Sequence, residues 1–165
     1  MKITEKNTMY EGNEYICEYE DVDSFDNLDY SFCKQTYAVC LCDGKMVIAY
    51  RGKKKKWGLI GGHIEKGETF EQTLKREIKE ESNMEVLKFL PVGYQKATDT
   101  RDNSFVYQLR YVCIVRPYGP FVSDPDGSIV EIKLIDPKDY KKYFDWGKIA
   151  DRIIERALEL KDKLK

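Results

Sequence analysis

Hydrophobic residues gather along the chain in short runs that polar turns separate, and this pattern predicts several strands. The clearest pair is 36–42 and 45–51, with Asp43-Gly44 between them. Asp-Gly between two β-rich runs is a strong signal for a two-residue hairpin turn. Further strands are predicted over 86–90, 105–115 and 129–135.

One amphipathic helix is predicted over 70–82. Thr69 is expected as its N-cap, with Gln72 three residues later as in a capping box. Asn83 is expected to end the helix in the left-handed conformation, which asparagine tolerates better than most residues. The apolar stripe of this helix consists of Phe70, Leu74 and Ile78.

A second amphipathic helix is predicted over 146–164. Its apolar positions at helical spacing are Ile149, Ile153, Ala157, Leu160 and Leu164. Strands interleaved with two helices argue for an α/β sandwich. We expect residues 36–165 to form this domain and residues 1–35 to form an N-terminal extension packed on it.

Composition limits the class of protein. The 165 residues suit one domain, and 42% apolar with 35% charged residues is typical of a globular chain. No apolar run approaches the ~18 residues of a membrane span, and no apolar segment follows the N-terminal charges, so no membrane partner and no signal peptide are expected. The five cysteines lack C-x-x-C spacing, which favours reduced, buried thiols in a cytoplasmic protein.

Charge is balanced overall but uneven along the chain. The net charge of −1 argues against a globally basic nucleic-acid binder, so a nucleic acid partner is not expected. Residues 1–34 nevertheless hold nine acids and three lysines, whereas residues 45–56 hold six basic residues and no acid. The run Lys53–Lys56 could attract phosphate-rich substrates, RNA included, or could be an ordinary solvated loop.

The first helix carries the candidate chemistry. Glu77, Glu80 and Glu81 fall on or beside its apolar stripe at spacings that make them neighbours. Lys75, Lys79 and Ser82 mark the opposite face, which is expected to be wet. Three like charges in a partly buried cluster repel one another and lose hydration, so a divalent cation is the natural partner. Mg²⁺ prefers such carboxylate oxygens and is commonly shared with substrate phosphates.

Two neighbouring features strengthen this interpretation over a solvated helix edge with salt bridges. Arg76 could orient one of the carboxylates through a charge-assisted hydrogen bond. Gly61-Gly62 precedes the helix, and glycine lets the backbone approach a ligand closely and offer a carbonyl oxygen.

Residues 62–84 resemble the Nudix box, G-x5-E-x7-R-E-U-x-E-E-x-G-U, where U is aliphatic. Asn83 replaces the second glycine of the pattern, and its expected left-handed cap should spare the site. The matching positions are Gly62, Glu68, Arg76, Glu77, Ile78, Glu80, Glu81 and Met84.

The resemblance implies a Nudix fold, an α/β/α sandwich with a mixed sheet and a C-terminal helix. It also implies Mg²⁺- or Mn²⁺-dependent hydrolysis of a nucleoside diphosphate linked to another moiety. The implied partners are a nucleotide-type substrate and, as a further candidate, a second copy of the chain. The implied metal ligands are Glu77, Glu80, Glu81 and the Gly61 carbonyl. Glu68 is implied as a metal-site residue that supports these ligands or binds the metal through water, and Arg76 as the residue that orients a glutamate.

A later loop adds a candidate ligand. Asp126, in Pro125-Asp126-Gly127, resembles the position where some family members supply an extra metal ligand, but it also fits an ordinary turn. The general base is expected to be a box glutamate or a later acid, and the later candidates are Asp124, Asp126 and Glu131.

Several activities stay open within the family. The expected one is a pyrophosphohydrolase that cleaves a phosphoanhydride bond. A non-catalytic nucleotide-sensing module is disfavoured because the acids of the box are complete. RNA 5′-end pyrophosphohydrolysis is favoured only by the lysine run. An isoprenoid diphosphate isomerase would need a reactive cysteine, and Cys40 and Cys42 show no sign of activation.

Overall fold

The structure is a computed structural model, and it describes residues 1–9 and 12–165. The described strands are β1 (Lys2–Met9), β2 (Asn13–Asp21), β3 (Cys33–Cys42), β4 (Lys45–Arg51), β5 (Lys56–Gly58), β6 (Ile60–His63), β7 (Met84–Asp99), β8 (Phe105–Pro117) and β9 (Ile129–Ile135). The described helices are α1 (Phe70–Ser82), α2 (Gly147–Leu160) and the short 3₁₀ helices η1 (Tyr30–Phe32), η2 (Pro137–Lys142) and η3 (Lys161–Leu164).

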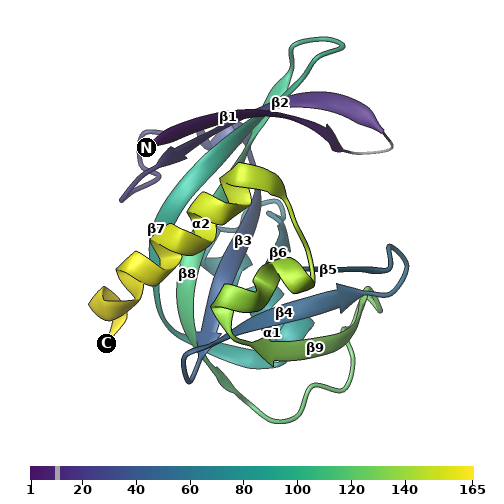
Figure 1. Cartoon of the computed structure of the whole chain (residues 1–165), viewed down its shortest axis with the longest axis vertical. Coiled ribbons are helices and arrows are strands. Elements are labelled where there is room, and N and C mark those ends of the chain that lie inside the picture. Colours follow the sequence, from purple (N-terminus) through teal and green to yellow (C-terminus); the bar gives the residue numbers. More distant parts are fainter. Residues whose placement is uncertain (10–11) are drawn as a thin grey trace.

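A single mixed sheet forms the middle layer, with α1 and α2 on opposite faces (Figure 1). Its strand order is β1-β2-β7-β8-β3-β4-β5, while β6 pairs with β3 and β9 pairs with β4. Strands β3 and β8 run parallel, and the other pairs are antiparallel. The predicted α/β/α sandwich is confirmed.

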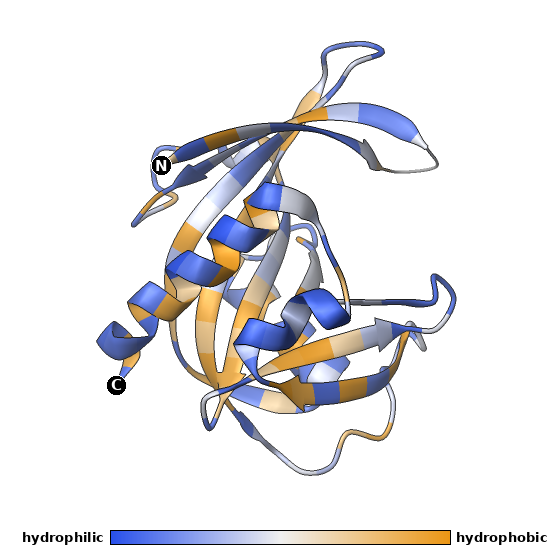
Figure 2. Cartoon of the chain, in the orientation of Figure 1, coloured by the Kyte–Doolittle hydropathy of each residue, from blue (hydrophilic) through white to orange (hydrophobic). Residues whose placement is uncertain are grey.

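Strand β3 shows how both faces of the sheet are covered. Alternate side chains point to opposite faces, so Val39 and Leu41 join the core beneath α2, whereas Ala38 and Cys40 join the core beneath α1. The apolar side of α2 faces the sheet, and its hydrophilic side faces outward (Figure 2). All five cysteines are buried and unpaired, as expected.

The local signals of the sequence appear as predicted. Thr69 accepts a hydrogen bond from the Gln72 backbone N–H at 3.1 Å, and the Gln72 side chain accepts one from the Thr69 N–H at 2.9 Å. Asn83 ends α1 with φ 55°. In the β3–β4 turn, Asp43 and Gly44 have φ values of 50° and 78°, as a two-residue hairpin of this kind requires.

Three predictions differ from the structure. The strand predicted over 86–90 is only the first part of β7, which continues through register shifts near Val86 and Pro91. Ser82 was assigned to the wet face, and this was wrong: it is buried, and its hydroxyl donates to the Ile78 carbonyl at 2.6 Å, so its polarity is satisfied inside the helix. The last turn of the predicted C-terminal helix is the 3₁₀ helix η3.

The N-terminal hairpin β1–β2 extends the same sheet, because β2 pairs with β7. It also caps α2, whose N-cap residue Trp146 offers no side-chain hydrogen bond. The side chain of Glu5 supplies the missing cap. Its carboxylate accepts hydrogen bonds from the backbone N–H of Lys148 at 2.6 Å and of Ile149 at 3.3 Å. A carboxylate at this helix end also complements the helix dipole.

Within the described ranges 1–9 and 12–165, no helix has the length and apolar character needed to cross a membrane.

Candidate active site on helix α1

Glu81 is the most deeply buried carboxylate of α1, with its side chain 7% exposed. One of its oxygens accepts a hydrogen bond from the Gly61 N–H at 2.9 Å, and both oxygens lie 3.4 Å from Nη2 of Arg51. Burial raises the pKa of Glu81 to about 7, although Arg51 and the Gly61 N–H favour the ionised form. The negative charge of Glu77 adds to this rise in pKa.

Arg76 lies at the centre of the remaining acids. Its Nε and Nη2 donate to the two oxygens of Glu68 at 2.8 and 2.9 Å, which is the two-pronged geometry that guanidinium favours. Its Nη1 donates to Glu77 at 3.0 Å and to Glu80 at 3.2 Å, and its Nη2 also donates to the His63 carbonyl at 3.0 Å. The predicted orienting role thus has a structural basis that reaches three glutamates.

The four acids have different environments. Burial raises the pKa of Glu77, and the charge of Glu80 adds to the rise. The hydrogen bonds from Arg76 lower the pKa of Glu68 to about 2, with help from the Glu65 N–H and the Thr73 hydroxyl. Glu68 is therefore fully occupied by protein donors, whereas Glu77 and Glu81 carry charge that their surroundings oppose.

Gly61 and Gly62 of strand β6 pack directly against these carboxylates. A Cβ on Gly62 would lie 2.4 Å from Oε1 of Glu77, and a Cβ on Gly61 would lie 2.1 Å from the carbonyl oxygen of Thr36. Both distances are far below van der Waals contact. At Gly61 the obstacle is the backbone of β3, and at Gly62 it is the end of the Glu77 side chain. A larger residue at position 62 would therefore displace the Glu77 carboxylate.

The loop between β8 and β9 brings Asp124, rather than Asp126, to the site. Asp124 is 5% exposed, and its charge raises the pKa of both Glu77 and Glu81. Its carboxylate is held by the backbone N–H of Asp126 at 3.0 Å and by the Ser128 hydroxyl at 2.7 Å. Asp126 is exposed, and its backbone serves the turn that the Pro-Asp-Gly sequence suggested.

Asn83 ties that loop to the end of α1. Its side-chain amide donates to the carbonyls of Gly119 and Pro120 at 3.3 and 3.1 Å, and its own carbonyl accepts from the Tyr118 N–H at 3.0 Å. The residue that replaces the box glycine keeps the left-handed cap and adds side-chain contacts that glycine lacks.

Sequence reasoning missed Arg51, which contacts Glu81 across 30 positions, and Thr73, which binds Glu68. Arg51 closes a strand and carried no motif signal. Thr73 lies one helical turn from the cap, where a threonine hydroxyl can bond a neighbouring acid. For Asp124, its place before Pro125 was a signal that its carboxylate would be held within a turn, because aspartate commonly opens turns by accepting hydrogen bonds from backbone N–H groups.

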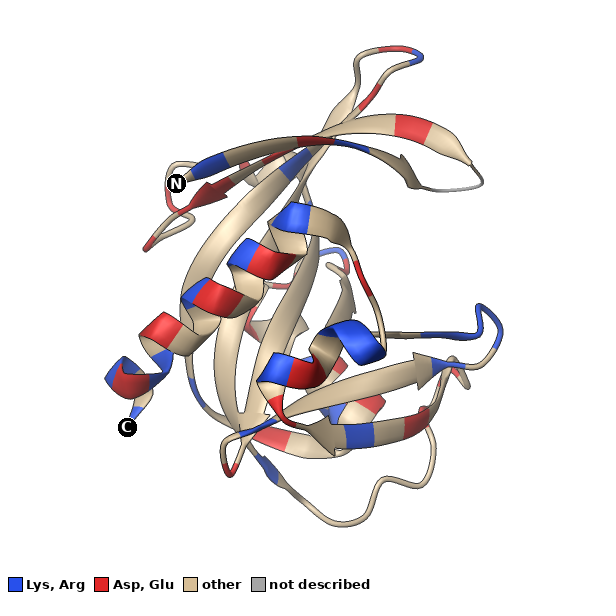
Figure 3. Cartoon of the chain, in the orientation of Figure 1, with Lys and Arg blue, Asp and Glu red and all other residues tan. Residues whose placement is uncertain are grey.

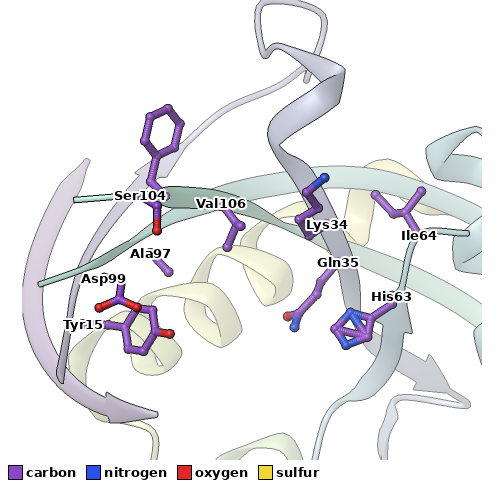
Figure 4. Close-up of a pocket in the computed structure, with 10 residues that line it drawn as sticks. Tyr15, Lys34, Gln35, His63, Ile64, Ala97, Asp99, Ser104 and Val106 are labelled. Atoms are coloured by element: carbon purple, nitrogen blue, oxygen red, sulfur yellow. The ribbon is translucent and has the colours of Figure 1, made fainter. Parts of the chain in front are cut away.

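A pocket of about 350 Å³ adjoins this cluster and is shown in Figure 4. Tyr15 and Asp99 lie together at one end, and Gln35 and His63 lie at the other. His63 connects the pocket to the box, because its carbonyl accepts from Arg76. Asp99 is held in the ionised state by Arg101, whose hydrogen bonds lower the pKa of Asp99 to about 2.

The donor set suits a hard divalent cation in its chemistry. Glutamate oxygens and a backbone carbonyl are the ligands that Mg²⁺ prefers, and the raised pKa values of Glu77 and Glu81 mark negative charge that a cation would stabilise. Among the described residues, no group of three or more aspartate, glutamate, histidine or cysteine side chains is arranged so that it could hold a metal ion. Arg76 bridges the acids instead.

An α/β/α sandwich with a Gly-Gly strand packed against a glutamate-rich helix is the architecture of a Nudix-type domain. A sequence profile described as NUDIX domain matches residues 34–157. The chain therefore belongs to the Nudix family.

Individual relatives agree with this assignment. Over 108 residues the chain is 31% identical to the protein named "Putative mutator protein MutT4" of Mycobacterium tuberculosis (strain CDC 1551 / Oshkosh), covering 66% of this chain and 43% of that one. The chain thus spans less than half the length of this relative.

Two solved structures resemble the fold. A variant of the pyrophosphohydrolase BsRppH from Bacillus subtilis has a TM-score of 0.70 at 14% identity, over 98% of this chain and 99% of that one. A NUDIX hydrolase from Nitrosomonas europaea has a TM-score of 0.64 at 20% identity, over 81% and 96%.

Proposed function

We propose that this chain is a divalent-metal-dependent pyrophosphohydrolase that cleaves a phosphoanhydride bond in a nucleoside diphosphate linked to another moiety. The observation that carries the proposal is the packing of Glu77 and Glu81 against Gly61-Gly62 of strand β6, with their ionised forms opposed by burial. A fold alone would gain nothing from burying two such carboxylates.

Glu77, Glu80, Glu81 and the Gly61 carbonyl would hold the cation, for which Mg²⁺ is our candidate. When bound, such an ion neutralises charge on the diphosphate oxygens and lowers the pKa of a coordinated water. The chain's own residues prepare the site. Arg76 holds Glu77 and Glu80 in place.

Glu68 and the loop acid have separate roles in this proposal. Because the oxygens of Glu68 are engaged by Arg76, Thr73 and a backbone N–H, we assign it to positioning Arg76 rather than to direct metal contact. We assign Asp124, in place of Asp126, as the loop acid of the metal site. It is buried, and its negative charge raises the pKa of Glu77 and Glu81. The proton acceptor is then a box glutamate or Asp124.

The pocket beside His63 is the candidate site for the nucleoside. Pockets of a few hundred Å³ with mainly apolar walls and a few polar groups are typical of small-ligand sites. Tyr15 and Phe105 supply aromatic surface, and Gln35 supplies an amide. Tyr15 comes from the N-terminal hairpin, so this hairpin would contribute to substrate choice.

The test is a substrate panel with Mg²⁺ or Mn²⁺. It contains canonical and oxidised nucleoside triphosphates, ADP-ribose, nucleotide sugars, dinucleoside polyphosphates and 5′-triphosphorylated RNA, with released phosphate and pyrophosphate read by ion-exchange chromatography. We expect metal-dependent cleavage of one class, and a loss of at least 100-fold in Glu80→Gln.

The matched control is Glu71→Gln, which removes an exposed glutamate of the same helix that forms an ion pair with Lys75. It should retain wild-type turnover. Nucleotide binding without any product over hours, at high enzyme and metal, would replace the hydrolase by a non-catalytic sensing module.

A further inference from the structure

Both tryptophans of the chain, Trp57 and Trp146, line a second cavity that the proposed function leaves unused. It has a volume of about 270 Å³ and lies between the β4–β5 turn and the segment that joins η2 to α2. Tyr143 and Phe144 complete its aromatic walls, and lysines of the turn stand at its rim. We call this cavity the tryptophan cleft.

The rings of the cleft form two packed pairs. The Trp57 and Tyr143 centroids are 5.8 Å apart at an interplanar angle of 77°, and those of Phe144 and Trp146 are 4.8 Å apart at 46°. Trp146 is 40% exposed, and Trp57 is half-buried. The aromatic surface of the cleft that is open to solvent is therefore mainly that of Trp146.

Positive charge is concentrated at the same place. Lys53–Lys56 are all exposed, and none of them forms an ion pair with any residue in the described ranges. They form the blue loop at the right of Figure 3. Lys133 adds a further ammonium 5.2 Å from the Trp57 centroid. Asp145 is the acid that lines the cleft, and one of its oxygens accepts from the Gly147 N–H at 2.9 Å.

The tryptophan cleft is connected to the catalytic helix through short contacts. The Trp146 ring lies so close to Gly58 that a Cβ there would be 2.8 Å from it, and the same Cβ would be 3.5 Å from Nη1 of Arg51. Arg51 in turn contacts Glu81. The cleft and Glu81 are therefore linked through Gly58 and Arg51.

We propose that the tryptophan cleft binds a base of a single-stranded nucleic acid, while Lys53–Lys56 contact its backbone phosphates. Aromatic platforms beside unpaired cationic side chains are the usual means of holding single strands without sequence preference. The near-zero net charge of the whole chain does not oppose this, because backbone binding needs only a local basic surface.

An anionic membrane is the competing partner for tryptophan and lysine side chains. Membrane-interface binding uses apolar side chains that protrude into the lipid. Here Phe144 is buried, and Trp57 and Tyr143 are half-buried in the walls of a concavity. A flat base enters such a slot, so we favour the nucleic acid.

The tryptophans make the test specific, because all intrinsic tryptophan fluorescence comes from this cleft. Single-stranded RNA or DNA of mixed sequence with a 5′-hydroxyl is titrated into the protein in EDTA, so no catalysis is involved. We expect saturable quenching by both, and little by the same sequence as a duplex.

The test variant is Lys53→Gln/Lys54→Gln/Lys55→Gln, and the control is Lys88→Gln/Lys161→Gln/Lys163→Gln, which changes the net charge equally at exposed positions. The test variant should bind at least tenfold more weakly, with a salt slope reduced by about 2 for three lost phosphate contacts. The control should change affinity less than twofold.

No quenching by single strands, or equal weakening in both triple variants, would overturn the proposal. Quenching by phosphatidylserine vesicles without quenching by oligonucleotides would assign the cleft to a lipid surface and also overturn it. If quenching occurs but no 5′-triphosphate of any kind is cleaved with Mg²⁺, the proposed function fails and the binding site stands. If 5′-triphosphorylated RNA is cleaved but single strands cause no quenching, the proposed function stands and the binding site in the cleft fails.

Discussion

Glu81 provides a test that separates a functional carboxylate from a structural ion pair. Its side chain is 7% exposed, and burial raises its pKa from the ordinary 4.5 to about 7 despite the nearby guanidinium of Arg51. At a pH between 4.5 and about 7, the Glu81 carboxyl has released its proton in the unfolded chain but keeps it in the folded protein. Folding is therefore opposed by ionisation of this group.

The sign and the size of the effect follow from linkage. Because the folded-state pKa is raised, the contribution of Glu81 to stability is complete below the unfolded-state pKa of 4.5 and is lost as the pH rises through about 7. At about 1.4 kcal/mol per pKa unit, the loss at pH 8 approaches about 3 kcal/mol in the metal-free protein. Glu81→Gln carries no charge and keeps an oxygen for the Gly61 N–H, so it should escape this loss.

The assay is urea unfolding in EDTA, followed by tryptophan fluorescence at pH 5 and pH 8. We expect Glu81→Gln to exceed the wild type in free energy of unfolding by about 2–3 kcal/mol at pH 8 and by less than about 1 kcal/mol at pH 5. The exposed Glu71→Gln should stay within about 0.5 kcal/mol of the wild type at both values. A Glu81→Gln variant that is less stable at pH 8, or equally shifted at both pH values, would refute the reasoning.

Substitutions at three other positions test separate parts of the account. Gly62→Ala should lower kcat at least tenfold with an unchanged circular dichroism spectrum, because the new Cβ would lie 2.4 Å from Glu77; wild-type kcat would contradict the close packing. Asn83→Ala should lower the free energy of unfolding by about 1–2 kcal/mol, because position 83 has a φ of 55°. Asn83→Gly should lower it less. Equal losses of stability for the two variants in urea titrations would contradict the conformational explanation. Thr69→Ala should cost about 1 kcal/mol through the lost cap, and an unchanged urea midpoint would count against it.

Features set by neighbouring residues were predictable from the sequence. The bounds of α1, its capping box and its left-handed Asn83 cap all depend on contacts within a few positions, as does the Asp43-Gly44 turn. The position of the glutamates beside the apolar stripe follows from helical geometry alone. These local signals were enough to locate the candidate site on one helix.

Features that depend on distant segments were not predictable. Arg51 reaches Glu81 only because β4 and α1 pack together, and the sequence gives no sign of this contact. The choice between Asp124 and Asp126 depends on which side chain the loop turns inward. The length of β7 escaped because Pro91 interrupts the pattern that predicts strands, whereas the structure accommodates it at a register shift.

The tryptophan cleft illustrates the same limit. Lys53–Lys56 are conspicuous in the sequence, but Trp57 and Trp146 lie 89 positions apart and meet only in the folded protein. Without that convergence, the lysine run has the pattern of any solvated loop.

The central claim is that the glutamates of α1 hold a divalent cation, and the most direct measurement is Mn²⁺ binding followed by electron paramagnetic resonance, without any substrate. The account predicts saturable binding by the wild type and by Glu71→Gln, with affinity at least tenfold weaker in Glu80→Gln and in Glu81→Gln. Equal Mn²⁺ affinity in the wild type and all three variants, or no binding by the wild type, would contradict it.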